Sequence, residues 1–115
     1  MPKHEVHLSS FGDTGGFSAT IDLENGHLAV WFDHAKEQRK YERALLPDEL
    51  STLHELTTRA MAEEPTVGSH PQSVVGDEHI RIVDGEDTFT SEAKWGYFTG
   101  GAIKELFVWA ASQRG

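Results

Sequence analysis

The clearest alternation of apolar and polar residues lies between residues 17 and 33. Two runs of alternating apolar residues are separated there by Asn25-Gly26. Asn-Gly accommodates the positive φ angles of a type I′ turn, so this segment is predicted to be a hairpin with a two-residue turn. In that register Ile21 faces Val30, and the apolar residues gather on one face of the hairpin.

The flanking segments extend this hairpin into a meander of four strands. Residues 5–11 alternate as a strand does, and the glycines within residues 12–16 predict a turn that leads into residue 17. Residues 39–43 are charged apart from Tyr41. Charged side chains discourage pairing with other chains, so we expect an edge strand there.

The period of the pattern changes after residue 45. Between residues 46 and 62 apolar side chains recur at three- and four-residue steps, which predicts a helix of about four turns. Pro47 suits its first position, and Asp48 and Glu49 favour the positive end of its dipole. Residues 63–76 hold prolines and glycines without periodicity, so a long loop is expected.

The last third of the chain predicts a second hairpin and a second helix. Residues 78–84 and 87–95 read as strands around Gly85-Glu86, a turn that pairs Ile82 with Phe89 and Asp84 with Asp87. Residues 102–111 carry a helical apolar stripe, with Thr99 as the expected N-cap.

This order of elements predicts an α+β fold. We expect an antiparallel sheet of about six strands, in the order ββββ-α-ββ-α, with the two helices packed on one face. A length of 115 residues suits one domain spanning residues 1–115.

Composition excludes several classes of function. The chain has no Cys and a formal charge of −9. The absence of Cys excludes disulfides, thiolate metal sites and cysteine nucleophiles. The negative charge argues against binding to nucleic acid. No apolar run would span a bilayer, and the start of the chain lacks the apolar stretch of a secretory signal. We therefore expect no membrane partner and a cytoplasmic location.

Two local motifs suggest chemistry, but both lack the surroundings that the chemistry needs. Asp13-Thr14-Gly15 matches the catalytic tripeptide of aspartic proteases, but Phe11-Gly12 supplies one of the two apolar residues that precede it in that family. His4, Glu5 and His7 are candidate metal ligands, but only the last two share a face of a strand. We expect no catalytic residue, no metal site and no cofactor.

A candidate binding surface lies on the face of the first hairpin opposite its core. The predicted register sets Trp31 across from Thr20 there, with Asp22 and Asp33 on the same face. An exposed tryptophan suits the anchor of a protein interface, because aromatic side chains dominate binding energy. Alternatively, Trp31 is covered by residues 63–76, by Tyr41 or by a second copy of the chain.

The acidic excess forms a second candidate surface. Between residues 77 and 92 six carboxylates accompany a single basic side chain, Arg81. Like charges across a hairpin cost stability, so this segment is expected to steer a cationic partner, although a solubilising turn would have the same composition. The residues concerned are Asp84, Glu86, Asp87 and Glu92.

In layout the chain resembles the small acidic α+β immunity proteins of bacterial toxin systems. The resemblance rests on the hairpin 17–33, the helix start Leu46-Pro-Asp-Glu-Leu-x-x-Leu53 and the final hairpin and helix. It implies a non-catalytic domain that covers the basic active-site cleft of a toxin. Asp84, Glu86, Asp87 and Glu92 would then steer the toxin, and Trp31 with Asp33 would anchor it.

Two other classes of function stay open. One is a small-ligand or metal-binding domain, enzymatic or not, that uses residues 63–76 as a lid. The other is a structural protein that forms a homodimer or larger homo-oligomer by pairing the sheet faces that carry Trp31.

Overall fold

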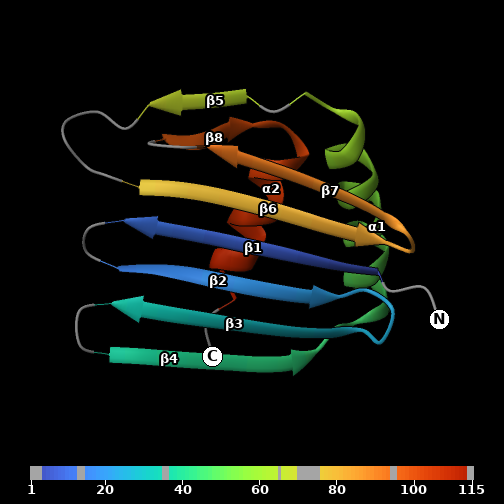
Figure 1. Cartoon of the computed structure of the whole chain (residues 1–115). Helices are drawn as coiled ribbons and strands as arrows, with labels where there is room; N and C mark the ends of the chain where they lie inside the picture. Colours follow the sequence, from blue (N-terminus) through green and yellow to red (C-terminus); the bar gives the residue numbers. More distant parts are fainter. Residues whose placement is uncertain are drawn as a thin grey trace.

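The computed structural model describes residues 4–12, 15–34, 37–64, 66–69, 76–93 and 96–113. These residues form two helices and eight strands (Figure 1). In chain order the elements are β1 (His4–Gly12), β2 (Gly15–Asp22), β3 (His27–His34), β4 (Glu37–Ala44), α1 (Pro47–Ala62), β5 (Thr66–Ser69), β6 (Gly76–Asp84), β7 (Asp87–Ala93), β8 (Gly96–Gly100) and α2 (Gly101–Ala111).

Six strands form the main sheet, in the spatial order β4-β3-β2-β1-β6-β7. Each neighbouring pair is antiparallel, including β1 with β6. The predicted α+β class and the order ββββ-α-ββ-α are therefore confirmed. β4, the charged strand, lies at an edge as expected.

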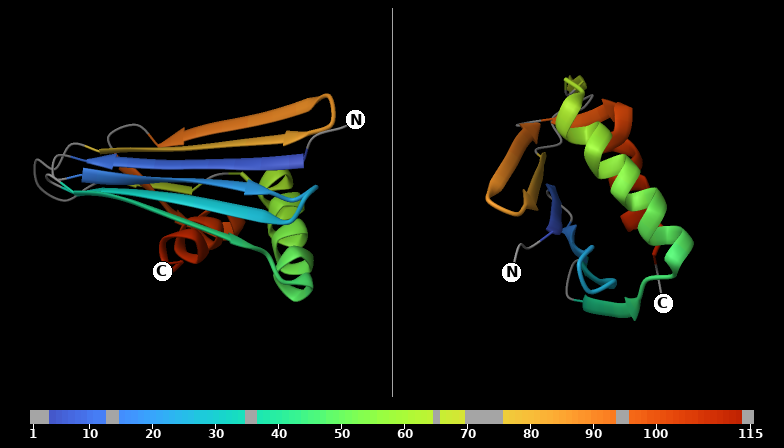
Figure 2. Two further views of the ribbon diagram at one scale, coloured as in Figure 1. Left: turned by 90° about the horizontal axis from the view of Figure 1, so that it is seen from below. Right: turned by 90° about the vertical axis from the view of Figure 1, so that its right-hand side faces the viewer.

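Both helices lie on one side of this sheet, behind it in Figure 1. α1 follows β4 and crosses behind the sheet toward β5, which the end-on view of Figure 2 also shows. The crossing carries the chain from one edge of the meander to the other. For this reason β6 pairs with β1 and places β1 in the middle of the sheet.

The hydrophobic core fills the space between the sheet and the helices. Alternate residues of the four inner strands are buried there, among them Val6, Ile21, Val30 and Ile82. The helices contribute Leu53, Leu56, Ala60, Ile103, Leu106, Phe107 and Ala110. This arrangement is the expected one for an antiparallel sheet with a single covered face.

The first hairpin has a longer loop than predicted. Asp22 pairs with His27, so residues 23–26 form a four-residue loop, and Ile21 faces Leu28 where the two-residue turn had placed it opposite Val30. Asp22 explains the difference, because its carboxylate accepts hydrogen bonds from the backbone N–H groups of Glu24 and Asn25. The register moves by two residues, so the apolar side chains keep the predicted face.

The second hairpin has the predicted register. Ile82 pairs with Phe89 and Asp84 with Asp87, around the two-residue turn Gly85-Glu86. Gly85 has a φ of 65°, a value that glycine adopts without the penalty of a Cβ.

The region predicted as a long loop contains a strand. Residues 66–69 form β5, which pairs with β8, a second strand that the sequence pattern did not predict. β8 is held to β6 by Glu78, whose Oε1 accepts the N–H of Phe98 at 2.7 Å. The predicted cap Thr99 belongs to β8, and Gly100 is the N-cap of α2. Residues 70–75 lie outside the described part, so a lid there stays a prediction.

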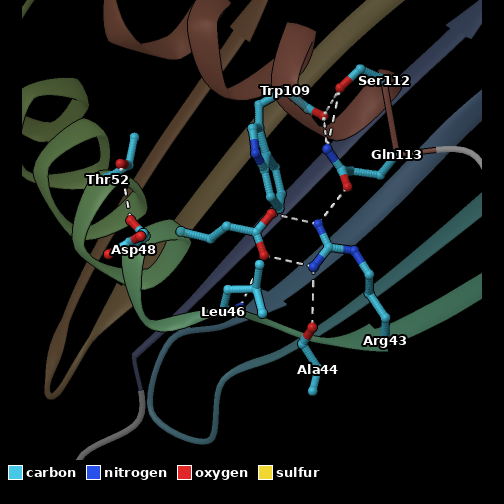
Figure 3. Close-up of polar contacts among 9 residues, drawn as sticks. Arg43, Ala44, Leu46, Asp48, Thr52, Trp109, Ser112 and Gln113 are labelled. Carbon is cyan, nitrogen blue, oxygen red and sulfur yellow. Dashed lines mark hydrogen bonds and ion pairs between the residues drawn. The ribbon is translucent and has the colours of Figure 1, made fainter.

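A polar cluster joins the edge strand β4 to both helices (Figure 3). Arg43 donates two hydrogen bonds of 2.6 Å to the carboxylate of Glu49 and a third to Gln113. Its guanidinium also lies 5.9 Å from the ring centroid of Trp109. The hydrogen bonds from Arg43 outweigh burial and, with one from the Leu46 N–H, lower the pKa of Glu49 to about 2.

Candidate binding surface

The helices cover one face of the six-stranded sheet, and the other face points away from them (Figure 2). The pairing registers place every second residue of positions 5–11, 16–22, 27–33, 38–44, 77–83 and 88–92 on that second face. We call this surface the open face. Its side chains alternate with the core residues, so the strands that build the core also fix the positions of the open face.

The open face is acidic. It carries six carboxylates against two permanently positive side chains, Lys40 and Arg81, so its net charge is −4 when its histidines are neutral. The acidic residues are Glu5, Asp22, Asp33, Glu42, Asp77 and Glu92. A surface of this sign attracts cationic partners and repels the phosphate backbone of nucleic acids.

Two histidines of the open face pair with two of these carboxylates. His7 Nε2 lies 3.2 Å from Glu5 Oε2, and His79 Nδ1 lies 3.3 Å from Glu92 Oε2. The side chains of all four residues are partly exposed, between 26% and 46%. These pairs leave the carboxylates accessible from solvent.

The centre of the open face is hollowed. A broad depression of about 650 Å³ lies over β1, β2, β6 and β7. Hydroxyl, imidazole and charged side chains surround it, including Ser18, Thr20, His79, Arg81 and Glu92. A depression this broad and open suits a protruding part of a partner better than a small ligand, which needs an enclosed pocket.

Thr20 and His7 of this depression, with the neighbouring Glu5, follow the order hydroxyl, imidazole, carboxylate. Thr20 Oγ1 lies 3.3 Å from His7 Nδ1, and Glu5 contacts the other ring nitrogen. Acyl transfer also needs donors aimed at an oxyanion. β1, β2 and β6 are paired on both sides, so their ladders already use the backbone N–H groups beneath this site. Within the described part of the chain, the strands beneath these three side chains therefore supply no backbone oxyanion hole.

Trp31 lies on the open face and is 38% exposed. Its neighbour on β2 is Ser18, whereas the predicted two-residue turn would have placed Thr20 opposite Trp31. Lys40 of β4 lies on its other side, with Nζ 5.3 Å from the ring centroid, so the ring has a cation beside it as well as carboxylates. Phe11 of β1, which lies on the other side of β2 from Trp31, is 55% exposed. The two aromatic side chains lie roughly 12 Å apart by strand spacing.

The other acidic residues predicted near Trp31 differ in what holds them. Asp33 is two residues along β3 from Trp31, on the same face, and is exposed. The carboxylate of Asp22 accepts hydrogen bonds from the loop 23–26. Burial opposes ionisation of Asp22, but hydrogen bonds from the Asn25 side chain and from the Asn25 and Glu24 backbone outweigh it and lower the pKa.

The second predicted surface lies elsewhere. Asp84, Glu86 and Asp87 are at the β6–β7 turn, at one corner of the sheet. Glu92 is on the open face, four strands from Trp31, or roughly 19 Å at the usual strand spacing. The structure therefore brings Trp31 and Asp33 together but keeps them apart from the turn.

The structure gives little support to the candidate metal and protease motifs. Glu5 and His7 share the open face as predicted, whereas the ring of His4 lies 4.8 Å from that of His54 in α1. Within the described ranges no three His, Cys, Asp or Glu side chains are arranged to hold a metal ion. Asp13 and Thr14 of the protease-like tripeptide lie outside the described residues.

Comparison with known proteins adds no relative. No protein-family model matches the chain, and no curated protein matches it. Among the helices that the structure describes, none is long and apolar enough to cross a membrane.

Several residues of the open face escape prediction from sequence. His79 and Arg81 lie beside Ser9 and His7 because β6 pairs with β1. These strands are separated by five other elements along the chain, and no local pattern encodes their pairing. Phe11 could have been found, since it alternates with the apolar residues Val6 and Leu8 of the same strand.

Proposed function

We propose that this chain is a non-catalytic binding domain that docks a basic protein on the open face of its sheet. The observation that carries the proposal is the composition of that face, on which a net charge of −4 surrounds two exposed aromatic side chains. Trp31 and Phe11 supply apolar anchors, and the carboxylates supply steering and specificity.

The shape of the face supports a protein as the partner. A sheet of six strands presents roughly 25–30 Å across its strands, enough for an interface of ordinary size. The depression in its centre accepts a projecting side chain or turn of the partner. The Asp84, Glu86 and Asp87 corner carries charge of the same sign and extends the attraction beyond the contact area.

Within this class we propose an immunity protein that acts in the bacterial cytoplasm. A toxin that acts on nucleic acid needs a basic cleft, and an acidic sheet face that covers this cleft would block its substrate. Occlusion of this kind needs no catalytic group on the inhibitor. The resemblance of the layout to small acidic immunity proteins favours this choice over the small-ligand alternative.

The test is a titration of the purified chain with the protein encoded by the adjacent gene, in low and high salt. We expect a one-to-one complex whose dissociation constant rises with salt, because screening weakens steering charges. Asp33→Lys should weaken the complex by more than about tenfold. Glu55→Lys on α1, an exposed residue on the opposite side of the molecule, is the matched control and should leave it unchanged. No complex, or equal effects of the two variants, would contradict the proposal.

A further inference from the structure

The two edges of the main sheet differ in their protection. β4 carries Arg39, Lys40 and Glu42, charged side chains of the kind that prevent edge pairing. β7 pairs with β6 alone in the described part of the chain, and its middle residues Thr88 to Ser91 carry no charge. A strand whose middle residues favour β-structure and carry no charge is a template for another strand.

Alternate N–H and C=O groups of the β7 backbone point outward from the sheet, as pairing with another strand requires. The two-residue turn makes Asp84 and Asp87 the first hydrogen-bonded pair, and antiparallel pairs then alternate. By this alternation the N–H and C=O groups of Thr88, Thr90 and Glu92 point away from β6. The side chains of these three residues are exposed.

We propose that β7 is a self-association edge, through which two copies of this chain pair antiparallel and join their sheets. The partner is a second copy because β7 is complementary to itself in one register. With Thr90 opposite Thr90 the residues from Thr88 to Glu92 are paired, and each outward-pointing backbone group among them meets another.

The charges agree with this register. It sets Thr88 opposite Glu92 and Phe89 opposite Ser91, so no two carboxylates face each other. A shift by two residues in one direction places Glu92 opposite Glu86, and the opposite shift leaves fewer residues paired. A shift by one residue turns half of the backbone groups away from their partners.

Cysteine cross-linking tests the register directly, since the native chain has no Cys. In the proposed dimer the two copies of Thr90 have Cα atoms about 5.5 Å apart, within the range of a disulfide. The two copies of Thr88 are separated by four residue steps, or about 14 Å, which is beyond that range. Under mild oxidation Thr90→Cys should form covalent dimers at least about tenfold faster than Thr88→Cys. Equal rates would overturn the proposal.

Sedimentation of the native chain over a concentration series supplies a second readout. We expect a dimer that Thr90→Lys converts to a monomer, because the substitution sets two ammonium groups opposite each other. Thr90→Val keeps a β-branched side chain and should stay dimeric, as should Gln38→Lys on β4. Circular dichroism of each variant confirms that it is folded. A native chain that stays monomeric throughout, or a Gln38→Lys variant that dissociates as Thr90→Lys does, would overturn the proposal. The docked protein takes no part in either experiment, so the outcome is independent of the proposed function.

Discussion

Arg43 and Glu49 show how a single ion pair can secure the edge of a sheet that packs against helices. Their side chains are 24% and 21% exposed, and the two bonds between them are in the bidentate geometry that makes such pairs strong. By contrast, the pair Lys40–Glu42 on the same strand is about half exposed on both sides and contributes little. Position in the fold therefore decides which of the charged residues of β4 matter for stability.

The first prediction concerns this pair. Glu49→Gln should lower the free energy of unfolding at pH 7 by about 1–2 kcal/mol, measured by urea denaturation. The pKa of Glu49 lies at about 2, below its ordinary value of 4.5, so its contribution is complete above about pH 4.5 and is lost as pH falls through about 2. The difference from the native chain should therefore vanish near pH 2. Glu42→Gln is the control and should leave the stability almost unchanged, because this carboxylate lies in solvent. A difference that persists at pH 2 would contradict this assignment.

The second prediction separates two aspartates of the open face. Asp22→Ala removes three hydrogen bonds within the loop 23–26 and should lower the melting temperature by about 4–8 °C. Asp33→Ala removes an exposed carboxylate and should change it by less than about 2 °C. Calorimetry measures the melting temperature of each variant. Equal melting temperatures would show that Asp22 does not stabilise the loop.

At the scale of elements, the strong local patterns predicted most of the fold. The two helices, the four-stranded meander and the Gly85-Glu86 hairpin follow from periodicity and turn chemistry. The loop after Asp22 was too short in the prediction, because Asn-Gly signals a tight turn whereas the Asp22 carboxylate favours a wider one. β5 and β8 were missed because each is short and contains glycine, so their pairing depends on tertiary contacts.

Phe98 tests the importance of that second sheet. Its side chain is fully buried and stacks on Phe107 of α2 with ring centroids 5.6 Å apart. Phe98→Ala should therefore lower the free energy of unfolding by about 3–5 kcal/mol. Val67→Ala on the paired strand β5, where the side chain is 50% exposed, should cost less than about 0.5 kcal/mol. Similar losses for both variants in urea denaturation would mean that β8 packs less tightly than described.

At the scale of the whole molecule, the fold divides the acidity of the chain into two regions. The prediction from sequence placed acidic residues around Trp31 and at the second hairpin. Asp33 lies beside Trp31 on the open face, and Asp84, Glu86 and Asp87 lie at the turn, whereas Glu92 lies on the open face away from it. It could not give the distance between them, because that depends on β6 pairing with β1 at the far side of the meander. The same pairing creates the central depression, whose histidines and Arg81 come from strands distant in sequence.

The central claim is that the open face binds a basic protein, with Trp31 as an anchor. The most direct test is the affinity of Trp31→Ala for the protein encoded by the adjacent gene, measured by calorimetric titration. The account predicts a loss of at least about 30-fold, as expected for an aromatic hot spot. Val108→Ala, which truncates a side chain 56% exposed on α2, should bind as the native chain does. An unchanged affinity for Trp31→Ala, or a comparable loss for Val108→Ala, would contradict the account.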